Sequence, residues 1–342
     1  MSFWDRLDGS RQIYFGGTVA SPWRTLRRRI LTPGTAATSL AVRGFHEKSP
    51  AARELLETIG RTFLAGFGYA AQARRPVDAE EHLEKVPVQF RGFGYEGAAM
   101  AFAILDGLPF GGGRNVERFV AGRGGAHIYM VYVGVGWAMA RLPRFRWHTL
   151  TVPDPLLRWL ALDGYGFHQA YFHTQRYVHE QFHDDRFPWP ADGPQWYASR
   201  AIDQGIGRAL WFVGGTAVDV VTTTIERFPE HRRPDLYSGA GLAATYAGGV
   251  DDEELRAFWD RAGDHRPQVA QGSAFAASAR VRAGLVVPHN ELATRVFCGM
   301  TVAEAAAVTD RTRPDGQVPG ALPAYEVWRR STANELVSIG RC

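Results

Sequence analysis

The sequence predicts a mostly α-helical protein, built from tandem helical hairpins in a solenoid-like or bundle-like array, with at most short β segments. The first observation is a glycine pair that recurs along the chain, each time at the start of an apolar run. Its copies are Gly92-Phe93-Gly94, Gly122-Arg123-Gly124, Gly164-Tyr165-Gly166, Gly205-Ile206-Gly207 and Gly239-Ala240-Gly241, with a weaker one at Gln271-Gly272-Ser273-Ala274. Such internal similarity indicates that one structural unit was copied. Because glycine lacks a Cβ, we expect that unit to be a helix packed closely on its neighbours.

Composition and helix-start signals support the same fold class. Of the 342 residues, 45% are hydrophobic and 22% are charged, as in an ordinary globular protein with a large core. Residues 49–50 supply an N-cap serine followed by proline, residues 251–254 place four acids in a first helical turn, and residues 301–304 form a capping box. No long strand pattern is evident, although residues 86–90 and 283–287 are compatible with short strands.

We expect an irregular lead-in segment over residues 1–48 and one helical repeat domain over residues 49–342. The polar, proline-bearing residues 75–89 are predicted to connect two helices. Three further breaks contain glycine or proline and are predicted loops: residues 108–113, 187–190 and 311–323.

The sequence predicts a cytoplasmic protein without a transmembrane span. The longest apolar stretch, residues 128–140, is shorter than the roughly 20 residues that a membrane helix needs. Only two cysteines occur, Cys298 and Cys342, so no disulfide framework is implied.

One dense basic cluster comprises Arg24, Arg27, Arg28 and Arg29 in a chain of net charge +4. Such a cluster can contact phosphate or an anionic membrane surface. It can also be a solvated helix face or a docking segment, which is the interpretation we favour. We therefore expect no nucleic-acid partner, and peripheral membrane contact through these arginines stays an alternative.

Two literal motifs are weak. Gly92-x-Gly94-x-x-Gly97 matches the dinucleotide fingerprint, but Pro87 would interrupt the strand that should precede it. His179-Glu180-Gln181-Phe182-His183 matches the zinc motif H-E-x-x-H, in which two histidines one helical turn apart share a metal. No third ligand is evident from the sequence, so a zinc-dependent hydrolase that uses His179, Glu180 and His183 is kept only as an alternative. The sequence names no cofactor.

Polar residues inside apolar helices are the more informative candidates, because such groups cost free energy unless they are paired. His127 and Glu96 each interrupt an apolar run, and His168 and His173 stand among aromatic residues. Several histidines in one region favour an acid–base or ligand role. Further polar residues lie close to the glycine pairs: Asp163, Asp203, Gln204, Arg208, Asp235, Gln268 and Gln271. They either line a common rim or cap their own helices.

Several segments together resemble the UnbL-type proteins of bacterial enediyne biosynthesis. The resemblance covers about residues 24–312, and Asp163-Gly164-Tyr165-Gly166-Phe167-His168 is typical of it. The other segments are residues 26–33, 43–45, 93–97, 122–130, 136–138, 171–173, 203–205, 207–212 and 265–268. Gln169-Ala170 stands where the family is expected to have an acid and a glycine.

The resemblance implies an accessory protein that acts on, or binds, the linear polyene made by an iterative polyketide synthase. The predicted catalytic residues are His127, His168, His173, Glu96 and Arg208. The predicted ligand-binding residues are Tyr129, Trp137, Asp163, Phe167, Tyr171, Asp203, Gln204, Trp211, Phe212, Gln268 and Gln271. The alternative within the same setting is a non-catalytic protein that holds the polyene or docks the synthase to other core-assembly proteins. A desaturation would need an electron acceptor that the chain does not visibly encode.

Overall fold

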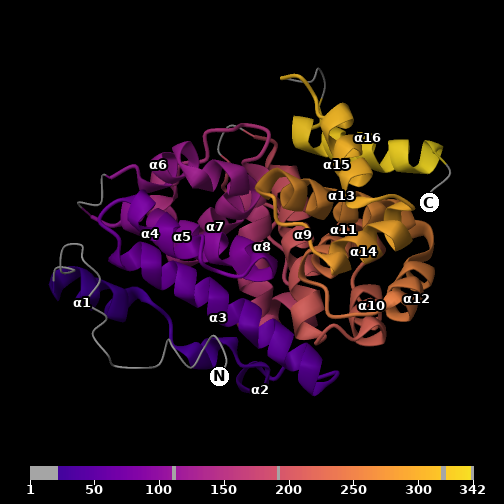
Figure 1. The fold of residues 1–342 in the computed structure, drawn as a ribbon. Coiled ribbons are helices and arrows are strands. Elements are labelled where there is room, and N and C mark those ends of the chain that lie inside the picture. The colour runs from indigo at the N-terminus through magenta and orange to yellow at the C-terminus, as the bar shows by residue number, and fades with distance from the viewer. Residues whose placement is uncertain (1–21, 110–112, 191–192, 317–320, 340–342) are drawn as a thin grey trace.

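The computed structural model describes residues 22–109, 113–190, 193–316 and 321–339, and Cys342 lies outside these ranges. All regular structure in them is helical, which confirms the predicted fold class (Figure 1). Within these described ranges, nine helices form the main array, and the first eight pack each on the next in chain order. They are α3 (Pro50–Gln72), α5 (Val88–Gly107), α7 (Ile128–Arg141), α8 (Trp159–Phe172), α9 (Gln195–Val213), α11 (Arg233–Ala247), α13 (Arg266–Ala283), α15 (Val302–Thr312) and α16 (Ala324–Ser338).

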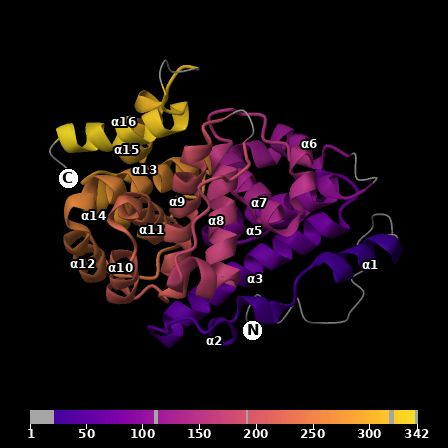
Figure 2. The ribbon, with the colours of Figure 1, turned by 180° about the vertical axis from the view of Figure 1, so that it is seen from behind.

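Shorter helices cover the ends and edges of this array. They are α1 (Pro22–Leu31), α2 (Leu40–Arg43), α4 (Pro76–Leu83), α6 (Asn115–Ala121), α10 (Val218–Glu226), α12 (Asp252–Ala262) and α14 (Pro288–Cys298). Seen from either side, the chain advances across the molecule from α1 and α3 at one end to α16 at the other (Figures 1 and 2). Among the described residues, no single helix is long and apolar enough to cross a membrane, and only the bent pair α14–α15 reaches that length and composition together.

Most of the glycine pairs lie inside helices, at the points where neighbouring helices cross, and not at helix starts as expected. In α9, a Cβ on Gly205 would overlap the carbonyl oxygen of Asp163 in α8, and one on Gly207 would overlap that of Leu236 in α11. The first glycine of a pair thus faces the preceding helix and the second faces the following one. The same arrangement recurs at Gly134 and Gly136, at Gly164 and Gly166, and at Gly239 and Gly241.

Several local expectations need correction. The segment predicted as a connector, residues 75–89, contains α4 and the start of α5, and neither 86–90 nor 283–287 is a strand. The described part of the lead-in is mainly helical. Gly122-Arg123-Gly124 opens a 3₁₀ turn before α7. The dinucleotide-like glycines 92–97 lie within α5, so they form no phosphate-binding turn.

The helix-start signals are confirmed. Ser49 caps α3 by accepting a hydrogen bond from the Ala52 amide at 3.2 Å. Asp251 opens α12 and Thr301 opens α15, each with a reciprocal capping box. These starts were readable from sequence because the cap is a local interaction between residues three positions apart.

Helix α1 is a docking segment. Arg27 donates to the carbonyl oxygens of Ala71 at 2.6 Å and Ala73 at 2.7 Å, and Arg28 donates to Gln72 Oε1 at 2.9 Å. The last carbonyls of a helix lack partners within that helix, and cations suit its C-terminus. Two arginines of the basic cluster therefore fix α1 to the end of α3.

The array is curved, so that helices distant in the order come together. Helices α5 and α11 are separated by α7, α8 and α9, yet Phe93 meets Tyr246 edge to face with ring centroids 5.3 Å apart. Gly92 of α5 leaves room for the Tyr246 hydroxyl, which a Cβ there would overlap. The side chains on the inner face of the curve therefore surround a common space.

Candidate functional site

A central cavity fills the inside of this curve. It holds about 880 Å³ of space free of atoms, with the solvent at its open side included. Pro33, Ala37 and Thr38 from the segment after α1 lie at the wall, together with the exposed Arg141. The rest of the wall is mostly apolar and comes from six helices: Leu56, Ile59, Gly60, Phe63, Leu64, Phe93, Glu96, Met100, Met130, Trp137, Phe167, Tyr171, Phe172, Arg208, Phe212, Leu242, Ala243, Tyr246 and Ala247.

Three buried charged side chains lie together in these mostly apolar surroundings. Arg208 Nη2 lies 3.9 Å from Glu96 Oε1, and Arg208 Nε lies 3.1 Å from Asp163 Oδ1. Glu96 and Asp163 are each exposed by less than 5% and Arg208 by 7%. The arginine charge thus lies between two carboxyl groups that water barely reaches.

Burial sets the protonation of this group. It raises the pKa of Glu96 to about 7, although Arg208 pulls that pKa down and Asp163 pushes it up. Burial also raises the pKa of Asp163, against the opposing effect of Arg208. A carboxyl group with a pKa near 7 is present in both protonation states at neutral pH, as a general acid–base group requires.

Three buried polar atoms at this place have no hydrogen-bond partner among the described residues. They are Arg208 Nε, Asp163 Oδ1 and the hydroxyl of Tyr246. Arg208 Nε and Asp163 Oδ1 are close enough for an ion pair but not aligned for a hydrogen bond. Because unsatisfied buried polar groups are costly and uncommon, these atoms mark a place for a polar ligand group.

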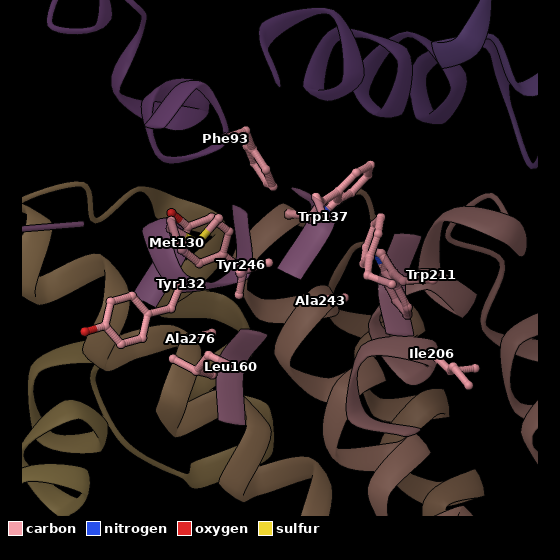
Figure 3. Packing of buried hydrophobic residues seen from close by; sticks show 14 of the residues in the cluster. Phe93, Met130, Tyr132, Trp137, Leu160, Ile206, Trp211, Ala243, Tyr246 and Ala276 are labelled. Carbon is pink, nitrogen blue, oxygen red and sulfur yellow. The ribbon is translucent and has the colours of Figure 1, made fainter. Parts of the chain in front are cut away.

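A second space, here called the distal cavity, adjoins the first. It holds about 490 Å³ of atom-free space, with the solvent at its open side included, and is lined by residues of α7, α8, α9, α11, α13 and α16. Four residues line both cavities and are here called the partition: Met130, Arg208, Leu242 and Tyr246. Figure 3 shows Met130 and Tyr246 close together, with Phe93 of the central cavity on one side of them and Leu160 of the distal cavity on the other.

The structure separates the predicted histidines from the cavity. His127 is buried and stacks on Tyr95 with ring centroids 3.7 Å apart, and it lines neither cavity. His168 is buried behind Trp137, 5.5 Å from it between ring centroids, and His173 is exposed. Burial lowers the pKa of His127 to about 4 and that of His168 to about 3, so both imidazoles are neutral at physiological pH.

The predicted ligand-binding residues fall into three groups. Trp137, Phe167, Tyr171 and Phe212 line the central cavity, whereas Tyr129 and Asp163 line the distal one. The remaining residues lie outside both cavities: Asp203, Gln204, Trp211, Gln268 and Gln271.

Several of these outlying residues have structural partners. Asp203 binds Arg232 at 2.9 Å, and the indole nitrogen of Trp211 donates to the carbonyl oxygen of Gly248 at 3.0 Å. Gln271 accepts a hydrogen bond from Ser238 at 2.8 Å.

The zinc-like motif does not form a helical histidine pair. His179 ends a π-helical turn, Gln181 has a positive φ of 54°, and His183 pairs with Asp185 at 2.9 Å. Both histidines are exposed. In the described part of the chain, no group of three histidine, cysteine or acidic side chains is placed to hold a metal ion.

Sequence reasoning missed Tyr246, Phe93 and Met130 as cavity residues. Each is an apolar or aromatic residue in an apolar helix, without any local signal that separates it from the core. Their role depends on the curvature that brings α5, α7 and α11 together, which no local pattern encodes.

Comparison with known proteins identifies a family whose function is unknown. No curated protein and no solved structure matches the chain. One family model, described as a protein of unknown function (DUF1702), matches residues 22–336 and so covers the helices described above except for Val337 and Ser338 at the end of α16. The chain therefore belongs to the DUF1702 family.

Proposed function

We propose that this protein binds a long, apolar, unsaturated chain in its central cavity and moves protons on it. In keeping with the resemblance to UnbL-type proteins, the proposed ligand is the linear polyene of enediyne biosynthesis, and the protein acts as an accessory factor in its maturation. The observation that carries the proposal is the buried Glu96–Arg208–Asp163 group, of which Glu96 and Arg208 lie in the mostly apolar wall of the central cavity.

The proposed chemistry is a proton shift along a conjugated system. The Glu96 carboxylate removes a proton from one carbon and returns it to another, so that a double bond moves and the molecular formula is unchanged. Arg208 and the Tyr246 hydroxyl are the groups that can donate to an oxygen on which negative charge develops. The step needs no oxidant or reductant.

Binding is tested with all-trans-parinaric acid, a linear tetraene whose fluorescence rises in apolar surroundings. Titration should show saturable enhancement with the wild-type protein. Ala243→Phe fills the central cavity and should weaken binding at least about tenfold, that is by about 1.4 kcal/mol. The matched control Ala257→Phe lies on the exposed face of α12 and should bind like wild type. If both variants bind all-trans-parinaric acid with equal affinity, the central cavity is not the binding site.

Proton transfer is tested with 3,5-octadien-2-one, a conjugated dienone, incubated with the protein in D₂O. Mass spectrometry should show deuterium uptake above the protein-free rate. Uptake should be lost in Glu96→Gln and kept in Glu117→Gln, which changes an exposed glutamate. Binding without any uptake in the wild-type protein would assign the cavity to holding the polyene and not to converting it.

A further inference from the structure

The two cavities share the four lining residues of the partition. Met130 has three rotatable bonds and adapts its shape readily, and Leu242 is also a flexible aliphatic residue. Arg208 and Tyr246 supply the polar part of the partition. Met130 and Leu242 are therefore the partition residues whose side chains change rotamer most readily.

The polar atoms at the partition lie between two apolar spaces. Arg208 Nε, Asp163 Oδ1 and the Tyr246 hydroxyl are buried and have no hydrogen-bond partner among the described residues. Beyond them, the distal cavity is walled by Leu160, Phe275 and Trp328, with Asp163 as its one carboxyl group among the described lining residues. An anionic chain end would be repelled by that carboxyl group and would lose its hydration there.

We propose that both cavities form one channel for a chain that carries an oxygen function in its interior. The oxygen, as a ketone or hydroxyl group, lies at Arg208 and Tyr246. One hydrocarbon arm occupies the central cavity and the other occupies the distal cavity. This proposal rests on the proposed function for the central cavity. It adds the position of the ligand's oxygen function and a place for a second hydrocarbon arm in the distal cavity.

Two isomeric ketones separate this arrangement from simple burial of an apolar molecule. 7-Tridecanone has an arm on each side of its carbonyl group, whereas 2-tridecanone has the same atoms with one long arm. Displacement of all-trans-parinaric acid should give a dissociation constant for 7-tridecanone that is lower by about tenfold or more. Equal constants for the two isomers would overturn the proposal.

Variants in the distal cavity and at the partition locate the effect. Ala276→Phe fills the distal cavity and should abolish the preference for 7-tridecanone while binding of the short 2-octanone stays unchanged. If Ala276→Phe does not fold, Ala279→Leu, at a half-buried position of the same wall, serves the same purpose. Tyr246→Phe should reduce the preference by removing the hydroxyl donor. A preference that survives in every variant would also overturn the proposal.

The failure of this proposal can be told apart from the failure of the proposed function. If all-trans-parinaric acid and 2-octanone bind but the two tridecanones do not differ, the channel is refuted and the central cavity stands as a binding site. If no probe binds, both proposals fall.

Discussion

At the scale of single residues, the molecule concentrates its unusual electrostatics on Glu96, Asp163 and Arg208. Each side chain comes from a different helix, α5, α8 and α9, and each carboxyl group lies one position before a glycine of a helix crossing. Helices α8 and α9 pack directly on each other, whereas Glu96 reaches Arg208 from α5 on the other side of α7. The packing of the array excludes water from all three side chains. The same packing that stabilises the array therefore raises the pKa of Glu96.

The raised pKa of Glu96 makes stability depend on pH. The folded-state pKa of about 7 lies above the ordinary value of 4.5, so between these values the unfolded chain binds fewer protons and stability falls as pH rises. Urea unfolding of wild type and Glu96→Gln at a series of pH values checks this. The free energy of unfolding of the variant, relative to that of the wild type, should rise by on the order of 3 kcal/mol between pH 4.5 and pH 7. Parallel curves would contradict the assigned pKa.

His168 is expected to be a packing residue. Its imidazole is neutral, and neither ring nitrogen has a hydrogen bond among the described residues. His168→Phe keeps the contact with Trp137 and should change the free energy of unfolding by less than about 1.5 kcal/mol, as volume-conserving core changes do. Binding of all-trans-parinaric acid should be unchanged. A loss of deuterium uptake in a folded His168→Phe protein would instead give this histidine a role in proton transfer.

At the scale of helices, the crossings depend on the contact of glycine with a backbone carbonyl. Because a carbonyl oxygen at the centre of a neighbouring helix cannot turn away, the space beside it admits no Cβ. This differs from a glycine that faces the tip of a flexible side chain, such as Gly68 of α3, whose nearest neighbour is the Arg28 guanidinium.

The two kinds of glycine should respond in opposite ways to alanine. Gly205→Ala places a Cβ on the carbonyl oxygen of Asp163 and should destabilise the protein by more than about 2 kcal/mol. Gly68→Ala should be neutral or stabilising by up to about 1 kcal/mol, because alanine is the better helix former. Thermal or urea unfolding of both variants checks the difference. Similar losses at both positions would mean that the carbonyl contact is not the cause.

The sequence predicted the features that depend on residues close together in the chain, and it did not predict those that depend on how distant helices meet. The helix class and the caps at Ser49 and Thr301 were predictable because they depend on residues close in sequence. Glu96 and Arg208 were marked as polar residues in apolar helices, and they do meet. His127 and His168 are also polar residues in apolar surroundings, but they lie outside the cavity. The sequence pattern does not show which side of a helix faces the inside of the curve.

At the scale of the whole molecule, the curvature joins the two sides of the cavity through Phe93 and Tyr246. A ligand in the central cavity would contact α3, α5, α7, α8, α9 and α11 together, but not α14 or α15. Ligand binding should therefore stabilise the helices that form the central cavity and leave the stability of α14 and α15 unchanged.

Hydrogen exchange measured by mass spectrometry checks this distribution. Addition of all-trans-parinaric acid should slow exchange in α3, α5, α8 and α11, since ligand binding stabilises the elements that form the site. Exchange in α14 and α15 should change little. Uniform protection along the chain would indicate that the array responds as one unit, and no protection would contradict binding inside the curve.

The wall of the central cavity is assembled from Pro33 to Ala247, so it exists only after most of the chain has been synthesised. Until α9 and α11 have been added, Phe167 lacks its partner Phe212, and the inner face of the curve is exposed to self-association on the ribosome or in a crowded cell. A small molecule that binds in the completed cavity would stabilise the folded protein. Supplying such a molecule during expression should therefore raise the yield of intact protein.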